Sequence, residues 1–298
     1  MNILETIAVR TRERIAEEKK QVSFAAVRQM AEEKARAEKQ EQNGMFPFRF
    51  QQALSGRDIA FICEVKKASP SKGIIAEEFP YLEIAKEYEQ AGASAISCLT
   101  EPFWFLGKDA YLKEITDTVQ IPVLRKDFTV DEYMIYQAKN LGASAILLIC
   151  AILDDSQLAS WHQLASELGL SVLTEAHTEE EIDRALKAGA QILGVNNRNL
   201  KNFTVDVEQS RRLRSMVPED VLFVSESGIK NHEDIQVLRE NGTDAVLIGE
   251  TLMRAADKNA MLDELKNGKG RGVTGYEQRK IWCPRWTIYS GNTDECSD

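Results

Sequence analysis

From about residue 59 onward, short apolar runs alternate with longer segments in which apolar residues recur at helical spacing. This alternation is typical of a parallel sheet or barrel with helices between its strands. We predict eight strands, over residues 59–66, 94–100, 122–126, 144–150, 171–175, 191–196, 221–225 and 244–248. A helix is predicted after each strand, near residues 81–90, 110–117, 131–140, 155–167, 179–187, 205–213, 231–240 and 260–266. Eight such units favour an α/β protein with a single (β/α)₈ TIM barrel over an open sheet.

A weak internal repeat supports this count. A glycine ends a predicted helix and precedes a predicted strand at Gly92, Gly142, Gly189 and Gly242. Successive glycines are 50, 47 and 53 residues apart (142 − 92, 189 − 142 and 242 − 189), so each interval holds two strand–helix units. We expect each glycine to adopt the left-handed conformation that commonly ends a helix.

The two ends of the chain differ from this pattern. Residues 3–39 contain no glycine and carry apolar residues at helical spacing, which predicts two helices, followed by a loop at 43–48. We therefore divide the chain into an N-terminal helical extension packed on the barrel (1–50), a catalytic barrel (51–267) and an atypical C-terminal tail (268–298). The tail is less polar than most disordered segments, so both a disordered appendix and a docking or oligomer contact stay open.

Composition and charge narrow the class of protein. The 298 residues are 43% hydrophobic and 28% charged, with a net charge of −10, which argues against a nucleic-acid partner. No apolar run approaches the roughly 20 residues that span a bilayer, and the first residues do not resemble a signal peptide. We expect a cytoplasmic protein. Cys63, Cys98 and Cys150 lie in predicted strands and are expected to be core thiols, without a disulfide framework or a zinc site.

The first predicted strand has one apolar side and one charged side. Side chains alternate along a strand, so Glu64 and Lys66 share one face while Phe61, Cys63 and Val65 share the other. Taken alone, this pattern is explained by a surface ion pair on an edge strand.

Seven of the eight predicted strands, however, end in charged or polar residues. In a (β/α)₈ barrel the active site lies at the C-terminal ends of the strands, so these side chains are predicted to converge there. The fourth strand, which stays apolar through Ile152, is the exception. The main candidates are Glu64, Lys66 and Ser69 near the first strand, Lys126 and Phe128 at the third, Glu175 at the fifth, and Asn196 and Arg198 at the sixth.

The residue types at these ends suit acid–base chemistry on an anionic substrate. Lys126 and Lys66 are suited to give protons or pair with substrate anions, and Glu64 and Glu175 to accept or relay protons. Asn196 and Arg198 are suited to hold a carboxylate or hydroxyls.

Glycine turns after the last two strands, Ser227-Gly228 and Gly249-Glu250, are typical of a phosphate site built from backbone N–H groups. Glu250 would offer its N–H while its carboxylate points away. His162, His177 and His232 are interpreted as core or surface residues, and no metal ligand cluster or cofactor is expected.

Six ordered motifs resemble a known family: Glu64-Val65-Lys66-Lys67-Ala68-Ser69-Pro70-Ser71-Lys72-Gly73, Leu124-Arg125-Lys126-Asp127-Phe128, Val172-Leu173-Thr174-Glu175, Gly194-Val195-Asn196-Asn197-Arg198-Asn199-Leu200, Ser225-Glu226-Ser227-Gly228-Ile229 and Leu247-Ile248-Gly249-Glu250-Thr251-Leu252-Met253. From the N-terminal helices to about residue 267, the sequence is similar to indole-3-glycerol phosphate synthase. The resemblance implies a carbon–carbon lyase of tryptophan biosynthesis. Its substrate would be 1-(2-carboxyphenylamino)-1-deoxyribulose 5-phosphate, which would be cyclised with loss of carbon dioxide and water.

The resemblance also implies catalytic roles. Lys126 matches the general acid that protonates the substrate carbonyl, and Glu175 matches the carboxylate that serves dehydration as acid or base. Glu64 matches a supporting carboxylate. Lys66 matches a cation that contacts substrate anions, and Asn196 belongs to the same catalytic group. How Lys66, Lys126 and Glu175 divide the proton transfers stays open.

Other positions match binding residues. Arg198 and Ser69 match residues that position the substrate near its carboxylate and sugar hydroxyls, together with Asn196, and Phe128 matches part of the apolar wall around the aromatic ring. The residues that match the phosphate site are Ser227, Gly228, Gly249 and Glu250.

Two alternatives remain in view. A phosphoribosylanthranilate isomerase would need a cysteine base at the end of the first strand, where Glu64 and Lys66 stand instead. A non-catalytic phosphosugar-binding barrel would be expected to lack Lys126 or Glu175, and both are present. The resemblance is compatible with a monomer or weak homo-oligomer that contacts other enzymes of tryptophan biosynthesis.

Overall fold

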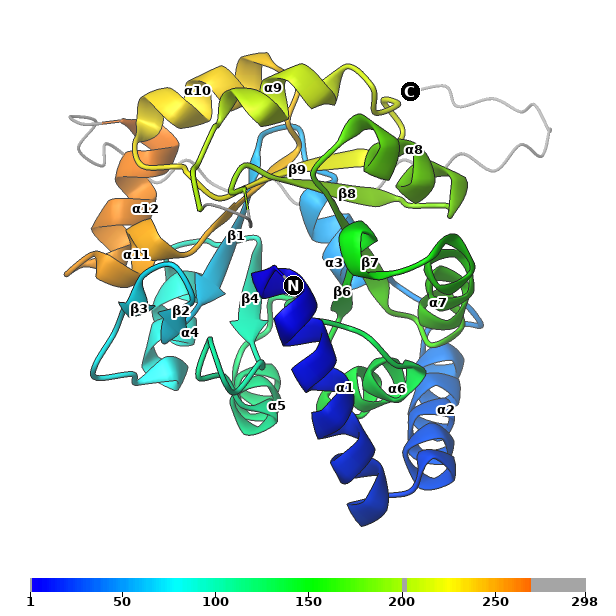
Figure 1. Ribbon diagram of the computed structural model, residues 1–298. Helices are drawn as coiled ribbons and strands as arrows, with labels where there is room; N and C mark the ends of the chain where they lie inside the picture. Colours follow the sequence, from blue (N-terminus) through cyan, green and yellow to red (C-terminus); the bar gives the residue numbers. More distant parts are fainter. Residues whose placement is uncertain (1, 200–202, 269–298) are drawn as a thin grey trace, which may run out of the picture.

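The computed structural model describes residues 2–199 and 203–268. Eight parallel strands form a closed barrel in the order β1-β10-β9-β8-β7-β6-β5-β4 (Figure 1). Their bounds are β1 Ala60–Val65, β4 Ala95–Leu99, β5 Val123–Lys126, β6 Ala145–Ile149, β7 Ser171–Ala176, β8 Ile192–Asn196, β9 Leu222–Glu226 and β10 Ala245–Ile248. The predicted (β/α)₈ fold is confirmed, and each of these eight barrel strands overlaps a predicted one.

The helices that follow the strands surround the barrel (Figure 1). They are α4 Tyr81–Gln90, α5 Asp109–Thr118, α6 Glu132–Leu141, α7 Asp155–Glu167, α8 Glu179–Lys187, α9 Glu208–Arg214, α10 His232–Glu240 and α12 Lys258–Asn267. Side chains at several N-caps accept hydrogen bonds from the first turn, which fixes where these helices begin; these N-caps are Asp131, Asp154, Thr178, Asn231 and Asp257.

Helix α9 begins later than predicted. The sequence pattern started it at residue 205, but the helix begins at Glu208. Val205 instead forms an isolated antiparallel bridge with Arg198, which keeps this part of the chain extended. Arg198 and Val205 are thereby held beside the mouth of the barrel.

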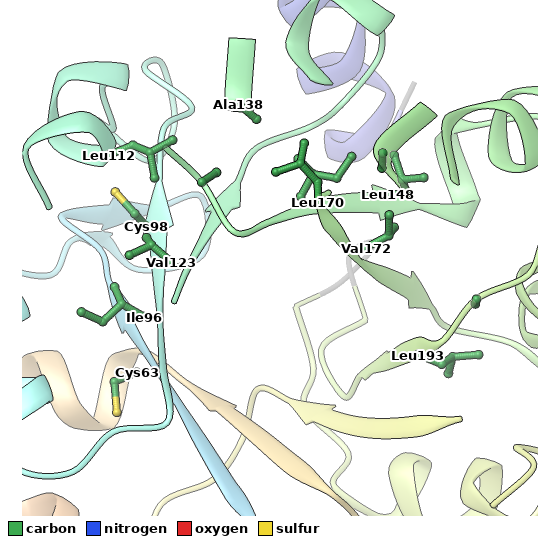
Figure 2. Close-up of a cluster of buried hydrophobic side chains, with 14 of the residues drawn as sticks. Cys63, Ile96, Cys98, Leu112, Val123, Ala138, Leu148, Leu170, Val172 and Leu193 are labelled. Carbon is green, nitrogen blue, oxygen red and sulfur yellow. The ribbon is translucent and has the colours of Figure 1, made fainter. Parts of the chain in front are cut away.

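Strand alternation divides the core into two layers. Outward side chains such as Cys63, Ile96 and Cys98 pack against the surrounding helices (Figure 2). Inward side chains form a separate cluster inside the barrel, with Ile62, Leu124 and Leu173 among its members. Because both faces of every strand are covered, the strands read as nearly continuous apolar runs, as the sequence does.

The thiols and glycines behave as the sequence predicted. Cys63, Cys98 and Cys150 are buried free thiols. All four repeat glycines have positive φ, between 72° and 90°, the left-handed conformation expected at the ends of helices; they are Gly92, Gly142, Gly189 and Gly242.

The two helices predicted before the barrel are present: α1 Ile3–Gln21 and α2 Phe24–Glu41. Asn2 and Glu5 form a reciprocal capping box that starts α1. Helix α2 packs along α6, while α1 runs across the mouth of the barrel (Figure 1). Ile3, Leu4 and Ile7 of α1 reach the cavity at that mouth.

Short elements absent from the prediction complete the two ends of the barrel. Helix α3 (Arg49–Leu54) buries Phe50 and Leu54 in the inner cluster before β1 begins. The hairpin β2 (Ala68–Ser69) and β3 (Gly73–Ile74) follows β1, a 3₁₀ turn η1 (Cys150–Ile152) follows β6, and α11 (Glu250–Arg254) follows β10.

Two predictions concern what lies beyond the barrel. Among the described helices, none is long and apolar enough to cross a membrane. The tail predicted from residue 268 lies outside the described residues apart from Gly268 itself.

Candidate active site

A cavity of about 590 Å³ opens at the C-terminal ends of the barrel strands. Its lining includes every residue that the sequence predicted for the site: Glu64, Lys66, Ser69, Lys126, Phe128, Glu175, Asn196, Arg198, Ser227, Gly228, Gly249 and Glu250. Strand β6 contributes the apolar Leu147 and Ile149, in keeping with its apolar sequence. The structure thus brings the predicted residues together, and their chemical roles stay predictions.

Lys126 lies at the centre of the polar groups. Its Nζ donates a hydrogen bond to Glu226 Oε2 and lies 3.6 Å from Glu175 Oε2. Asn196 Nδ2 donates to the other oxygen of Glu175, at 3.3 Å. All three charged side chains are nearly buried, so the ammonium group is fixed between two carboxylates with little water around it.

This arrangement shifts the pKa values of Lys126 and Glu226. Burial alone would lower the pKa of the Lys126 amine, but Glu226, Glu175 and Glu64 outweigh burial and raise it. Burial raises the pKa of the Glu226 carboxyl to about 7; Lys126 opposes this increase, and the carboxylates of Glu175 and Glu64 add to it. Lys126 therefore stays protonated at neutral pH, whereas the Glu226 carboxyl group titrates near neutral pH.

A second ion pair lies at the end of β1. Lys66 Nζ donates to Glu64 Oε1, and both side chains are largely buried inside the barrel mouth. They face the cavity and not the surrounding helices, so the surface ion pair considered from the sequence is excluded. A Cβ at position 249 would collide with the Glu64 carboxylate and the Lys66 amine, so a larger residue there would displace the ends of these two side chains.

The adjoining edge of the cavity, at the ends of β9 and β10, offers backbone N–H groups for an anion. Ser227 and Gly228 follow β9 with φ of 68° and 90°, a left-handed turn that exposes successive N–H groups. Gly249 follows β10 and precedes the short helix α11. These are the turns that the sequence predicted for phosphate.

Basic side chains surround Glu250 at this edge. Its carboxylate lies 3.4 Å from Lys72 Nζ, 3.2 Å from Arg254 Nε and 3.9 Å from Arg198 Nη2. Burial would raise the pKa of Glu250, but Arg254 and Lys72 outweigh it and lower the pKa. The Glu250 carboxylate is thus paired with the cationic side chains around it.

An aromatic wall closes another side of the cavity. The rings of Phe105 and Phe128 lie 6.0 Å apart, and both line the cavity. The loop that carries Phe105 is fixed by the buried Glu101 carboxylate, which accepts hydrogen bonds from the N–H groups of Phe103, Trp104 and Phe105. Such a wall suits a planar aromatic group.

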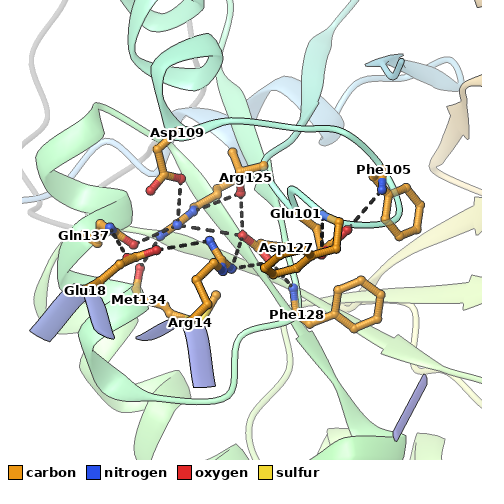
Figure 3. Close-up of polar contacts among 12 residues, drawn as sticks. Arg14, Glu18, Glu101, Phe105, Asp109, Arg125, Asp127, Phe128, Met134 and Gln137 are labelled. Atoms are coloured by element: carbon orange, nitrogen blue, oxygen red, sulfur yellow. Dashed lines mark hydrogen bonds and ion pairs between the residues drawn. The ribbon is translucent and has the colours of Figure 1, made fainter. Parts of the chain in front are cut away.

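A buried ionic network supports this wall and Lys126 from behind (Figure 3). Asp127, between Lys126 and Phe128 in sequence, accepts hydrogen bonds from both Arg14 Nη2, at 2.9 and 3.1 Å, and Thr100 Oγ1, at 2.7 Å. Arg125 Nη2 donates to Asp109 at 2.8 Å. Since Arg14 belongs to α1, the network joins the N-terminal helix to the loop that carries Lys126.

Glu226, Phe105 and Lys72 are cavity residues that were given no role from the sequence. Glu226 was placed in the loop after a strand predicted to end at 225, although β9 includes it and Val224 points into the barrel. Strand alternation puts Val224 and Glu226 on one face, which was the available signal. Phe105 and Lys72 lie in loops, where no periodic pattern indicates direction.

Metal binding was not expected from the sequence. Within residues 2–199 and 203–268, no group of three or more His, Cys, Asp or Glu side chains is arranged to hold a metal ion.

The fold and these groups define a (β/α)₈-barrel enzyme with a central lysine between carboxylates, an aromatic wall and an anion-binding edge. The family model described as indole-3-glycerol phosphate synthase matches residues 4–265. The chain belongs to the indole-3-glycerol phosphate synthase family.

Relatives of this family align over most of the chain. The indole-3-glycerol phosphate synthase of Ruminiclostridium cellulolyticum is 53% identical over 264 residues, covering 89% of this chain and 98% of the relative. That of Lachnoclostridium phytofermentans is 48% identical and covers 89% and 99%. That of Endomicrobium trichonymphae is 57% identical over 218 residues and covers 73% and 84%.

Solved structures with little sequence identity share the fold alone. The 3-hexulose-6-phosphate synthase of Salmonella typhimurium has a TM-score of 0.58 at 14% identity, covering 70% of this chain and 96% of that structure. The thiamine phosphate pyrophosphorylase of Pyrococcus furiosus has a TM-score of 0.53 at 18% identity, covering 72% and 95%.

Proposed function

We propose that this chain converts 1-(2-carboxyphenylamino)-1-deoxyribulose 5-phosphate into indole-3-glycerol phosphate, carbon dioxide and water, as a carboxy-lyase of tryptophan biosynthesis. The observation that carries the proposal is the position of Lys126, held between Glu175 and Glu226 at the base of a cavity with an anion-binding edge. Ring closure needs an acid at a carbonyl oxygen, and a buried, oriented ammonium group supplies one.

The substrate groups match the sides of the cavity. The phosphate lies against the N–H groups of Ser227, Gly228, Gly249 and Glu250. Its aromatic ring lies along Phe128, and Arg198, Asn196 and Ser69 hold the carboxylate and the sugar hydroxyls. Lys66 adds a cation near the substrate anions, and Glu64 orients Lys66 through their ion pair. This places the ketone near Lys126.

The first half of the reaction forms the new carbon–carbon bond. The ring carbon that bears the carboxylate attacks the ketone carbon while Lys126 donates a proton to the ketone oxygen, which becomes a hydroxyl. The carboxylate then leaves as carbon dioxide, and its bonding electrons restore the aromatic ring. The carboxylates around Lys126 stabilise its charged form before the transfer.

The second half removes water. The new hydroxyl leaves with a proton, and the adjacent CH₂ group loses a proton as the ring double bond forms. Glu175 lies 3.6 Å from Lys126 and serves this dehydration, so both proton-transfer groups act on one side of the substrate. The two halves together consume one proton, which balances the loss of carboxylate as carbon dioxide.

Two measurements on purified protein test the function. Wild-type protein given the substrate is expected to produce the fluorescence of the indole product. Lys126→Ala is expected to lose most of this turnover, about 10²-fold or more, while still binding a substrate analogue whose ketone has been reduced to an alcohol. Lys113→Ala, a change at an exposed lysine of α5, is the matched control and should keep full activity. A folded wild-type protein that forms no indole product would contradict the proposal.

The wider organisation is proposed with the function. Residues 1–50 act as a helical extension that covers the barrel mouth, 51–267 as the catalytic barrel and 268–298 as a separate tail. The chain acts in the cytoplasm as a monomer or weak homo-oligomer and contacts other enzymes of tryptophan biosynthesis. Light scattering on the full chain, with and without those enzymes, tests the assembly.

A further inference from the structure

His177 lies beside Glu175, just beyond the end of β7. It follows β7, and strand alternation puts its side chain on the same face as Glu175, one step further along. Its Nε2 atom lies 3.6 Å from Glu175 Oε1. This nitrogen is buried and has no hydrogen-bond partner among the described residues. A small movement of either side chain would join the two groups.

The other side of the imidazole is held by Glu181 of α8. The His177 backbone N–H donates to Glu181 Oε2 at 2.6 Å, and the ring Nδ1 lies 3.6 Å from that same oxygen. Thr178 caps α8 and accepts a hydrogen bond from the Glu181 N–H at 3.2 Å, which fixes Glu181 in the first turn. The imidazole therefore lies between the carboxylates of Glu175, at the end of β7, and Glu181, in the first turn of α8.

The groups facing His177 favour its charged form. Glu175 of β7, Glu181 of α8 and Glu226 of β9 are its charged neighbours, and Gln209 of α9 contributes only a neutral hydrogen bond to the His177 carbonyl. Burial opposes the charge, but Glu181, Glu175 and Glu226 outweigh it and raise the pKa of His177. The nearest cations act on the carboxylates: Lys126 lies beyond Glu175, and Arg184 acts on Glu181.

We propose that His177 is a positioning residue for Glu175. Its ring, held beside Glu181, keeps the Glu175 carboxylate turned toward the cavity, where it accepts the C–H proton that is lost as the indole double bond forms. This inference rests on the proposed dehydration role of Glu175. It extends the cavity residues by a second layer, Glu181–His177, which does not touch the substrate.

A nuclear magnetic resonance titration tests the contact without any substrate. The chain has only three histidines, so their imidazole signals are assigned by comparing wild type with His177→Gln and His162→Gln. We expect His177 to titrate above the ordinary 6.5, and to shift downward in both Glu175→Gln and Glu181→Gln. A His177 pKa at or below 6.5, or one that does not move in Glu175→Gln, would overturn the inference.

Kinetics provide the second readout. His177→Gln keeps a hydrogen-bond donor but cannot carry charge, so kcat is expected to fall about tenfold while KM changes by less than about twofold. His162→Gln changes a half-buried histidine on α7 and should leave both constants unchanged. Equal losses in both variants, or an unchanged kcat in His177→Gln, would reject the positioning role. If the wild type itself gave no product, the proposed function would fail, whereas the titration would still judge the contact between His177 and Glu175.

Discussion

Glu226 sets the charge of the Lys126 pocket. It is the hydrogen-bonded partner of the ammonium group, and burial raises its pKa to about 7. Below that pH the carboxyl is protonated and no longer balances the charge of Lys126. We therefore expect wild-type kcat to rise as pH increases through about 7, and Glu226→Gln to lack this rise and to lose roughly ten- to a hundredfold in kcat.

A pH–rate profile of both proteins checks this prediction. The reduced substrate analogue should bind both with similar affinity, because Glu226 is placed beside Lys126 and not at the anion-binding edge. An unaltered profile in Glu226→Gln would show that another group controls the rise.

The lowered pKa of His162 predicts that the free energy of unfolding depends on pH. Burial lowers its pKa to about 4, and its Nε2 lies 2.9 Å from Thr174 Oγ1. The unfolded chain protonates this histidine near its ordinary 6.5, so the neutral folded form contributes stability above that pH and loses it as pH falls toward 4. Relative to His162→Gln, the wild type should lose roughly 2–3 kcal/mol of unfolding free energy between pH 7 and 4.

Urea unfolding at several pH values gives the measurement. Equal slopes of stability against pH in wild type and His162→Gln would mean that His162 is not protonated preferentially in the unfolded chain.

Individual site residues could be predicted from the sequence when they lie at the end of a predicted strand. Lys126 and Glu175 were predicted in the cavity because their strands end in recognisable motifs. Glu226 was assigned no role because the predicted strand stopped one residue early, and the proximity of His177 to Glu175 depends on the cap of α8. Distances between side chains from different elements have no counterpart in a one-dimensional pattern.

Helix α1 is the element that connects the N-terminal extension to the catalytic loop. Arg14 bonds through Nη2 to both oxygens of Asp127, and both side chains are largely buried. Removing Arg14 leaves Asp127 in a protein interior with one fewer cation, which is costly. We expect Arg14→Met to lose roughly 3 kcal/mol of unfolding free energy and to lower kcat, because Lys126 and Phe128 flank Asp127.

The matched control is Arg12→Met, a change at an exposed arginine on the same helix. Thermal unfolding and activity should distinguish the two variants. Equal behaviour would indicate that α1 does not restrain the loop after β5.

The regular elements were predictable and the short ones were not. Each long strand and helix has a strong hydrophobic period, and observed bounds lie within a few residues of the predicted ones. The β2–β3 hairpin, α3 and α11 are too short to show a period, and α9 begins late because Val205 pairs with Arg198. Tertiary contacts decide such short segments.

The closed barrel is needed to form the cavity, because no single strand–helix unit contains all of its polar side chains. Lys126 comes from β5, Glu175 from β7 and Glu226 from β9, strands far apart in sequence that closure of the barrel brings to one mouth. The apolar inner cluster lies beneath them and keeps the carboxylates away from water. A (β/α)₈ barrel thus supplies a buried proton-transfer site from separate strand ends.

The central claim is that Lys126 serves ring closure and Glu175 serves dehydration. Rapid-quench kinetics on Lys126→Ala and Glu175→Gln test this claim most directly. Release of labelled carbon dioxide and formation of indole fluorescence are followed in the same reaction. We expect Lys126→Ala to lose both signals, and Glu175→Gln to release carbon dioxide while indole fluorescence forms far more slowly. Carbon dioxide release that is lost in Glu175→Gln but retained in Lys126→Ala would contradict this division of roles.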